Sequence, residues 1–212
     1  MSTFTNSDNC SDSDSYRKSQ YKIHVIYMIA VALLGFNSLA NSKPHLRPNN
    51  WAQPIINSEL QNFYQISDKL YRSEQPNGKA FKELASFGIK NVLNLRKHHT
   101  DNDEAKGTNI VLHHLKLSAK HLNQQQIIAA LKVIKQAKGT VLLHCWHGSD
   151  RTGAIAAAYR MVFEDWSAQD AIDEFINGGY GYHQWAFPNL IVLLQELDVK
   201  KIKKELGLPP QK

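Results

Sequence analysis

The distribution of apolar and polar residues predicts strands that alternate with helices along the chain. Apolar residues spaced three and four apart predict helices over residues 79–87, 123–137, 153–162, 168–176 and 189–206. Short apolar or β-branched runs predict strands over residues 63–66, 70–72, 90–96, 109–117 and 140–144. The last run, TVLLH, is typical of a buried central strand. This order predicts a single α/β domain with a mostly parallel central sheet flanked by helices.

Turn-forming residues mark the ends of these predicted elements. Ser67-Asp68 and Asn77-Gly78 are turn sequences, and Gly88 and Gly139 stand where helices are expected to end. Residues 98–107 and 148–152 are predicted as loops. Because an α/β fold binds ligands at the carboxyl ends of its strands, we expect the functional residues there.

The first 54 residues differ in composition from the rest of the chain. Residues 1–16 are polar and predict disorder, and three basic residues then precede a short apolar stretch, residues 23–36. Ser38 and Ala40 are small residues at the positions that a signal peptidase reads. We interpret residues 1–40 as a disordered n-region plus signal peptide, cleaved after Ala40, with an uncleaved membrane anchor as the alternative. An extended leader, residues 41–54, and a single domain, residues 55–212, are then expected.

Composition and charge exclude several classes of protein. With 21% charged and 42% hydrophobic residues, the chain can bury a core. No uninterrupted apolar run reaches 18 residues, which excludes a protein with several membrane spans. The net charge of +6 suits an anionic partner, and we expect no nucleic acid. The two cysteines, Cys10 and Cys145, exclude a disulfide-stapled scaffold, and only Cys145 follows the predicted cleavage site.

Residues 144–153, His-Cys-Trp-His-Gly-Ser-Asp-Arg-Thr-Gly, carry the candidate chemistry. They lie between a buried strand and a helix, where successive backbone N–H groups and the helix N-terminus can surround an oxyanion. Arg151, six residues after Cys145, can reach the same pocket and hold two phosphoryl oxygens. The same positive environment favours the nucleophilic thiolate of Cys145, and Thr152 can donate its hydroxyl to that sulfur. The complete pattern indicates phosphate chemistry.

This segment resembles the signature loop of the cysteine-dependent protein tyrosine and dual-specificity phosphatases. With DKLYRSEQPN at 68–77, KNVLNLR at 90–96 and NGGYGYH at 177–183, the chain is similar to the small periplasmic dual-specificity phosphatases of Gram-negative bacteria. The resemblance implies hydrolysis of phosphomonoesters through a cysteinyl-phosphate intermediate, without a metal or other cofactor. It implies that Cys145 is the nucleophile, Arg151 the phosphate clamp and His144 a support for the thiolate. The other residues expected around the phosphate are Trp146, His147, Gly148, Ser149 and Asp150.

The general acid is less evident than the nucleophile. The family usually places an Asp on the loop that here spans residues 117–123, but this loop contains no carboxylate. An alkoxide leaving group nevertheless needs a proton. We consider Asp150 first and His121, which lies on the expected loop, second. The third source is an acidic residue of the 98–107 loop: Asp101, Asp103 or Glu104.

Several functions remain open from the sequence. The leading one is a periplasmic or secreted phosphatase of phosphoproteins, and the second is a phosphatase of phosphoinositides, inositol phosphates or other small phosphate esters. A phosphate-binding pseudophosphatase is opposed by the intact Cys145 and Arg151. Arsenate reduction is opposed by the lack of a resolving cysteine after cleavage. We expect no metal site, because adjacent histidines such as His113 and His114 point to opposite faces of a strand. Membrane contact is expected only through an uncleaved signal segment.

Overall fold

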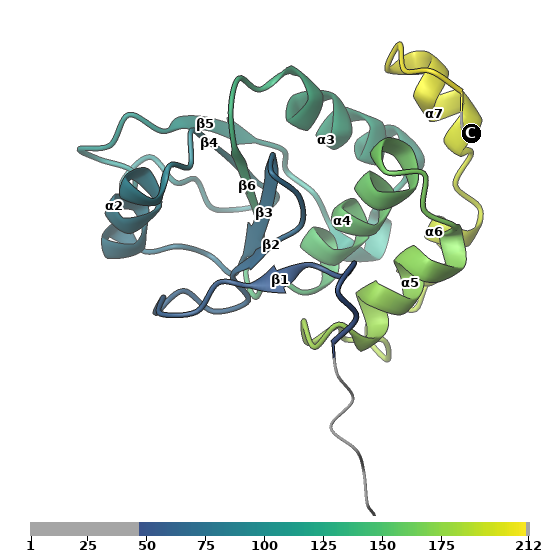
Figure 1. Cartoon of the computed structure of the whole chain (residues 1–212), viewed down its shortest axis with the longest axis horizontal. Coiled ribbons are helices and arrows are strands. Elements are labelled where there is room, and N and C mark those ends of the chain that lie inside the picture. The colour runs from purple at the N-terminus through teal and green to yellow at the C-terminus, as the bar shows by residue number, and fades with distance from the viewer. Residues whose placement is uncertain (1–46, 211–212) are drawn as a thin grey trace, which may run out of the picture. The chain divides into compact units, whose positions relative to one another are not determined.

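The computed structural model describes residues 47–210, and within them one sheet of six strands organises the fold (Figure 1). The strand order is β1-β2-β3-β6-β4-β5. The bounds are β1 Gln53–Pro54, β2 Tyr64–Gln65, β3 Leu70–Ser73, β4 Asn91–Asn94, β5 Val111–His114 and β6 Val141–His144. Strands β3, β6, β4 and β5 pair in parallel, whereas β1 and β2 are antiparallel to their neighbours. The predicted α/β domain with a mostly parallel sheet is confirmed.

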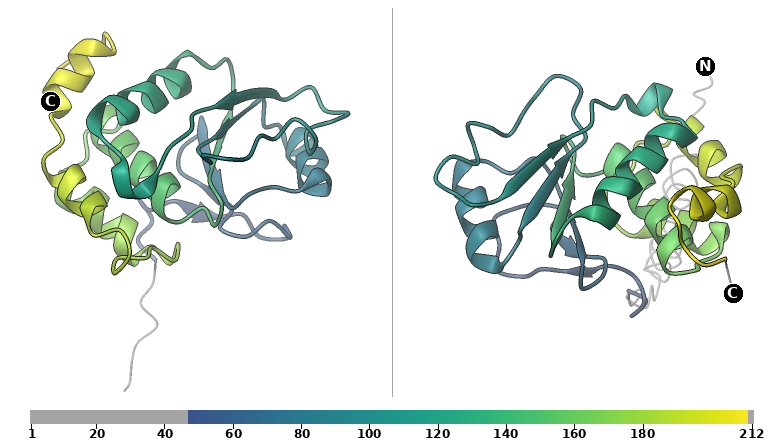
Figure 2. Two further views of the ribbon diagram at one scale, coloured as in Figure 1. Left: turned by 180° about the vertical axis from the view of Figure 1, so that it is seen from behind. Right: turned by 90° about the horizontal axis from the view of Figure 1, so that it is seen from above.

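Helices cover both faces of this sheet (Figure 2). Helix α2 lies on one face, and α3, α4 and the helices that follow lie on the other. Side chains alternate along the central strand, so Val141 and Leu143 enter the core under α3 and α4 while Leu142 enters the core under α2. The helix bounds are α2 Gly78–Phe87, η2 Ala119–His121, α3 Gln124–Gln136, α4 Asp150–Phe163, α5 Ala168–Asn177, α6 Asn189–Gln195 and α7 Val199–Glu205.

Short polar side chains determine where several helices begin. Asn77 caps α2 by accepting a hydrogen bond from the Ala80 N–H at 2.9 Å, so Asn77-Gly78 starts a helix and does not form the separate turn that we predicted. The predicted helix over residues 189–206 is instead two helices. It is interrupted because the Asp198 carboxylate accepts from the Lys201 N–H at 3.0 Å and starts α7 anew.

Helix α4 begins three residues earlier than the sequence predicted. Its first residue is Asp150, so the predicted 148–152 loop is shorter and Arg151 and Thr152 belong to the first helical turn. A Cβ atom on Gly153 would lie 2.2 Å from the ring of Phe175, so glycine is needed for the close approach of α4 and α5. This packing fixes the start of α4 and therefore the position of the residues in its first turn.

Residues 47–54, expected as part of an extended leader, pack against the domain. Ala52 is buried, its N–H donates to Glu174 Oε1 at 2.6 Å, and Arg47 Nη1 donates to the Gly178 carbonyl at 2.7 Å. The folded unit therefore begins before residue 55. The predicted signal peptide and its cleavage site after Ala40 lie outside the described residues. Among residues 47–210, none of the helices is long and apolar enough to cross a membrane.

Candidate active site

The segment after β6 forms a tight loop at the carboxyl end of the central strand. Cys145 is 2% exposed and directly follows β6, which lies between β3 and β4. Gly148 adopts a φ of 72°, and a Cβ atom there would lie 2.4 Å from the Ser73 carbonyl oxygen. Only glycine permits both this backbone conformation and this close approach. The loop is thus held against the end of β3.

Hydrogen bonds hold the carbonyl groups of this loop on its outer side. Three consecutive carbonyls are bound there: Trp146 O by the Gln75 N–H at 2.9 Å, His147 O by Asn62 Nδ2 at 2.8 Å, and Gly148 O by Arg72 Nη2 at 2.6 Å. In a trans peptide the N–H points opposite to the carbonyl, so the following amides turn towards the interior of the loop. Within residues 47–210 the N–H groups of residues 146–149 have no protein acceptor. The loop therefore has the form of an anion-binding nest.

Arg151 and Thr152 add two further donors without partners to this nest. Arg151 Nη1 lies 3.4 Å from both the Leu95 and the Leu117 carbonyl oxygens, which fix the guanidinium against the sheet edge. Arg151 Nε and Thr152 Oγ1 are both buried without a hydrogen-bond partner in the described part of the chain. The predicted bond from the Thr152 hydroxyl to the Cys145 sulfur is accordingly not formed. An unpaired buried donor costs about 1–3 kcal/mol, so a bound oxyanion would remove an unfavourable arrangement.

His144 lies completely buried behind Cys145 and bonds through both ring nitrogens. Its Nε2 is 2.9 Å from Asp101 Oδ2, and its Nδ1 is 3.1 Å from the Cys145 carbonyl oxygen. The Asp101 carboxylate and the Cys145 carbonyl oxygen can both accept a hydrogen bond from the ring. The arrangement is therefore suited to hold an imidazolium adjacent to the thiol, and such a charge would favour the thiolate.

Asp101 belongs to this buried pair and does not lie over the pocket. Burial by itself raises the pKa of Asp101, but the hydrogen bond and charge of His144 and the amide of Gln75 outweigh it and lower the pKa. Its Oδ1 accepts from Gln75 Nε2 at 2.9 Å and from Asn94 Nδ2 at 3.0 Å. With both oxygens engaged, Asp101 is connected to Cys145 by way of His144.

The other two acidic residues of the 98–107 loop also have partners. Asp103 is an exposed residue that pairs with Lys106 at 2.8 Å, and Glu104 pairs with His99 at 3.0 Å. His99, Asp101 and Glu104 offer ligating atoms within 4.8 Å of one another, the arrangement of a possible metal site. Asp101, however, already uses both oxygens for His144, Gln75 and Asn94, so this group is poorly suited to hold an ion.

Asp150, the first candidate for the general acid, forms a second Asp–His pair. Its carboxylate accepts from the His183 backbone N–H at 3.0 Å and lies 3.1 Å from His183 Nδ1. The His183 ring packs beside the ring of His147, with centroids 5.7 Å apart. His121, the second candidate, is an exposed residue of η2 for which the described residues show no side-chain hydrogen bond.

Two residues that support the loop, Arg72 and Tyr180, had no predicted role. Arg72 is 2% exposed, holds the Gly148 carbonyl, and its guanidinium lies 3.6 Å from the ring centroid of Tyr180. Burial lowers the pKa of Arg72. The Tyr180 carbonyl in turn accepts from Ser149 Oγ at 2.6 Å. The available signal for Arg72 was a charged residue inside an apolar strand, which requires a buried partner.

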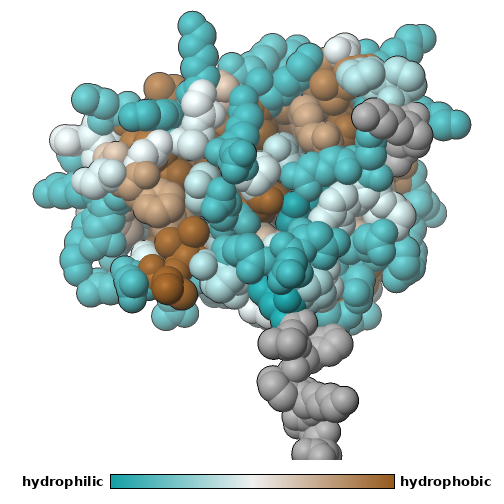
Figure 3. Space-filling view, viewed as in Figure 1, coloured by the Kyte–Doolittle hydropathy of each residue, from teal (hydrophilic) through white to brown (hydrophobic). Residues whose placement is uncertain are grey.

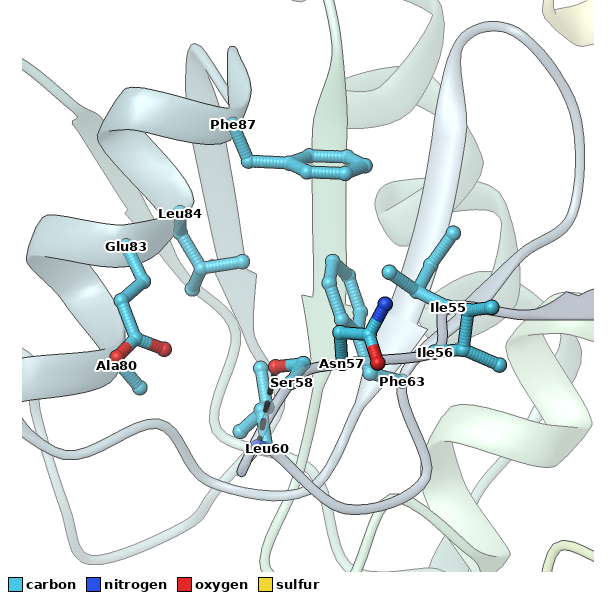
Figure 4. A pocket seen from close by; sticks show the side chains of 10 residues that line it. All are labelled: Ile55, Ile56, Asn57, Ser58, Leu60, Phe63, Ala80, Glu83, Leu84 and Phe87. Atoms are coloured by element: carbon cyan, nitrogen blue, oxygen red, sulfur yellow. Dashed lines mark hydrogen bonds between the residues drawn. The ribbon is translucent and has the colours of Figure 1, made fainter.

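A separate hollow lies away from this loop, between α2 and the segment that precedes β2 (Figure 4). It has a volume of about 200 Å³ and is lined mainly by apolar side chains, including Leu60, Phe63 and Leu84. Figure 3 shows hydrophobic residues gathered on this side of the molecule, where Ile56 and Phe87 are exposed. The residues that line the hollow include no lysine or arginine, so the hollow is a poorer site for an anion than the loop after β6.

Comparison with known proteins identifies the relatives of this chain. Residues 59–183 match the tyrosine phosphatase family. The dual specificity protein phosphatase TpbA of Pseudomonas aeruginosa is 33% identical over 158 residues, which cover 73% of this chain and 70% of TpbA. The inositol diphosphatase SIW14 of Saccharomyces cerevisiae is 25% identical over 175 residues, or 76% of this chain and 59% of SIW14.

Solved structures agree with these relatives. The crystal structure of P. aeruginosa TpbA superposes with a TM-score of 0.69 at 29% identity and covers 76% of this chain and 99% of TpbA. A crystal structure of a cysteine-to-serine variant of TpbA in complex with pTyr superposes equally well, with a TM-score of 0.69 at 28% identity, covering 76% and 98% of the two chains. The family match spans more than half of the chain and includes the whole phosphate loop. The chain therefore belongs to the tyrosine phosphatase family.

Proposed function

We propose that this protein is a phosphatase that hydrolyses phosphomonoesters of phosphoproteins, on tyrosine or with dual specificity, through a cysteinyl-phosphate intermediate. The observation that carries this proposal is the segment of residues 145–152, in which three loop carbonyls are bound on the outer side while Arg151 Nε and Thr152 Oγ1 have no partner among residues 47–210. An array of inward donors around a buried thiol suits a tetrahedral oxyanion. Membership of the tyrosine phosphatase family supports the same chemistry.

The proposed reaction has two steps at the Cys145 sulfur. The thiolate attacks phosphorus, a sulfur–phosphorus bond forms, and the bond between phosphorus and the leaving oxygen breaks. The inward amides and Arg151 stabilise the charge of the transferring phosphoryl group. Water then attacks phosphorus, the sulfur–phosphorus bond breaks, and inorganic phosphate leaves with both protons of the water. The released thiolate is stabilised by the adjacent His144, and the Thr152 hydroxyl, which has no partner in the described part of the chain, is available to donate to the sulfur at this step.

We assign the proton for the leaving oxygen to Asp150, with His183 as its link to solvent. Asp150 lies in the first turn of α4 beside Arg151, and its side chain is 11% exposed. The His183 side chain is 37% exposed and contacts the same carboxylate, so it can return a proton to Asp150 after each turnover. His121 is the alternative donor.

A second candidate function concerns the substrate and keeps the same chemistry. Relatives include inositol diphosphatases of Saccharomyces cerevisiae and Arabidopsis thaliana. These relatives favour inositol phosphates or other small phosphate esters as the alternative to phosphoproteins. A pseudophosphatase is less favoured, because Cys145 and Arg151 are both present and both lie at the loop.

The decisive experiment is hydrolysis of p-nitrophenyl phosphate by the full chain and by its Cys145→Ser variant. We expect turnover by the wild type and a loss of at least about a thousandfold in the variant, because the nucleophile is removed. Cys10→Ser, which removes the other cysteine, serves as the matched control and should keep full activity. Phosphate binding without turnover dependent on Cys145 would instead establish a pseudophosphatase.

We further propose that the protein is exported to the periplasm or secreted, with cleavage after Ala40. The basic residues, the apolar stretch at 23–36 and the small residues Ser38 and Ala40 support this proposal. Mass spectrometry of the protein from the periplasmic fraction should give a chain that begins at Asn41. A full-length chain in the membrane fraction would instead indicate an N-terminal anchor.

A further inference from the structure

A second arginine, Arg96, lies beside the phosphate loop. It follows β4, directly after Leu95, whose carbonyl oxygen accepts from Arg151 Nη1. The Arg96 guanidinium lies 4.2 Å from the ring centroid of Trp146, the residue that follows Cys145. Burial and then the nearby positive charge of Arg151 lower the pKa of Arg96. Because Arg151 is held at the carbonyl of Leu95 and Arg96 lies over the ring of Trp146, both guanidinium groups lie beside the same loop.

The direct contacts of the Arg96 guanidinium are with neutral groups, while the more distant charges of Asp101 and Glu104 raise its pKa and partly offset the effect of Arg151. Its Nη1 donates to Gln75 Oε1 at 3.1 Å, and the exposed ring of Trp146 covers one face of the guanidinium. Its backbone is fixed as well, since its N–H donates to Asn94 Oδ1 and its carbonyl bonds with His114 Nε2. No carboxylate of residues 47–210 forms an ion pair with Arg96. Nε and Nη2 have no protein acceptor in this range, so two donors remain for a ligand.

We propose that Arg96 forms a subsite for a second phosphate group, and that the enzyme favours small phosphate esters carrying two phosphates close together. This inference rests on the proposed phosphatase chemistry at Cys145 and favours the second candidate substrate class, small phosphate esters, over phosphoproteins. A planar guanidinium with free donors binds a phosphate through charge-assisted hydrogen bonds. A second anion beside the scissile phosphate would also relieve the repulsion between Arg96 and Arg151. Vicinal phosphates on one ring, or a diphosphate, match such closely spaced cations.

A phosphotyrosine peptide matches this pair of cations less well. Its aromatic ring separates the phosphoryl group from the peptide chain, so acidic side chains of the peptide lie far from the phosphate loop. The proximity of Arg96 to Arg151 therefore favours a compact polyphosphate over an acidic peptide. The exposed Trp146 ring, which is 57% exposed, provides an apolar face at the same rim for the body of the substrate.

The test compares one-phosphate and many-phosphate substrates in three variants. We would measure kcat and KM for p-nitrophenyl phosphate and for myo-inositol hexakisphosphate with Arg96→Met, Arg96→Lys and Lys97→Met. Arg96→Met should raise KM for the hexakisphosphate about tenfold more than KM for the aryl phosphate, because charge-assisted bonds are lost. Arg96→Lys keeps the charge but loses the planar guanidinium, so its KM for the hexakisphosphate should lie between those of the wild type and Arg96→Met. Lys97→Met removes an exposed neighbouring charge and controls for a general electrostatic effect. It should change the ratio of the two KM values by no more than about twofold, because an exposed charge is screened by salt.

Binding gives a readout that does not depend on turnover. In the Cys145→Ser background, calorimetry should show that Arg96→Met weakens binding of inositol hexakisphosphate about tenfold, whereas Lys97→Met does not. Equal changes for both substrates, or unchanged binding of the hexakisphosphate, would overturn the subsite. Loss of the proposed function is recognised separately, by absent turnover of the aryl phosphate in the wild type.

Discussion

Two pairs of aspartate and histidine flank the phosphate loop, and they differ mainly in burial. In the Asp101–His144 pair the His side chain is 0% exposed and the Asp side chain 2%, with 2.9 Å between Nε2 and Oδ2. In the Asp150–His183 pair the corresponding exposures are 37% and 11%, with 3.1 Å between Nδ1 and Oδ2. His144 of the first pair directly precedes Cys145 in sequence, and Asp150 of the second pair is the first residue of α4.

This difference in burial separates two functions of the same residue types. A fully buried ion pair cannot exchange protons with water easily, and loss of one partner leaves an uncompensated buried charge. The Asp101–His144 pair is therefore suited to supply a fixed positive charge beside Cys145. The Asp150–His183 pair reaches solvent through His183, so it is suited to gain and lose a proton in each turnover.

The largest expected effect comes from Asp101→Asn. The substitution keeps the shape but removes the charge that stabilises the His144 imidazolium, and it should reduce the free energy of unfolding by about 3 kcal/mol. Because Cys145 then loses an adjacent positive charge, its alkylation by iodoacetamide at pH 6 should also slow. Urea denaturation at pH 7 and the alkylation rate are the two measurements.

Asp103→Asn is the matched control for this prediction. Asp103 lies on the same loop but forms an exposed pair with Lys106, so the free energy of unfolding and the alkylation rate should not change measurably. If Asp101→Asn behaves like Asp103→Asn in both measurements, the buried pair has no role in positioning or charging His144.

Asp150→Asn should have the next largest effect, on kcat and not on stability. Removal of a general acid is expected to lower kcat for an alkyl phosphate about a hundredfold, whereas an aryl phosphate, whose leaving group needs little protonation, should lose much less. His183→Gln should lower the alkyl rate by a smaller factor, since Asp150 could still exchange protons more slowly. Steady-state rates on phosphoserine and p-nitrophenyl phosphate provide the comparison.

His121→Gln distinguishes the alternative donor in the same assay. If His121→Gln shows the selective loss on the alkyl phosphate and Asp150→Asn does not, the proton comes from the loop after β5. Equal losses on both substrates in Asp150→Asn would mean that Asp150 only maintains the structure of the loop.

Most helices and strands could be predicted from the sequence because apolar periodicity is a local pattern. Apolar periodicity located every main helix, and the apolar run at 140–144 identified the central strand, which is fully buried. Two of the errors concern positions where a side chain starts or restarts a helix, as Asn77 and Asp198 do. The early start of α4 is a different error, since its first turn has no side-chain cap. Such caps depend on one hydrogen bond and leave the periodicity unchanged.

The site was predictable only where its residues are adjacent in sequence. The contiguous pattern from His144 to Gly153 predicted a phosphate loop, and the structure has a tight loop at this place, whose binding of phosphate stays a prediction. The roles of Arg72, Gln75 and Asp101 depend on contacts across 76, 71 and 43 residues, respectively, or on networks that no spacing rule describes. The carboxylate of Asp101 was considered as an acid above the pocket, but folding of the 98–107 loop places it behind the nucleophile.

Acid should remove the contribution of the buried pair to stability. The pKa of Asp101 is lowered in the folded protein, so its contribution is fully present above the pKa of an unfolded Asp, about 3.9, and is lost as the pH falls through the lower folded value. The difference in unfolding free energy between the wild type and Asp101→Asn should therefore persist at pH 7 and pH 5 and shrink below about pH 4. A constant difference down to pH 3 would contradict a charged Asp101.

The smallest effect is expected from Glu104→Gln, which alters a third acid–histidine pair. This pair lies on the 98–107 loop, which also carries Asp101. Glu104 and His99 are 24% and 31% exposed and lie 3.0 Å apart, so their burial resembles that of the Asp150–His183 pair. Neither residue, however, forms a hydrogen bond with the phosphate loop, so the substitution should cost at most about 1 kcal/mol of stability and leave both the alkyl and the aryl rates unchanged. Rates and urea denaturation measured beside Asp101→Asn and Asp150→Asn test this. A selective loss of activity on the alkyl phosphate would contradict this expectation. It would mean that an acid–histidine pair without contact to the loop supplies the proton.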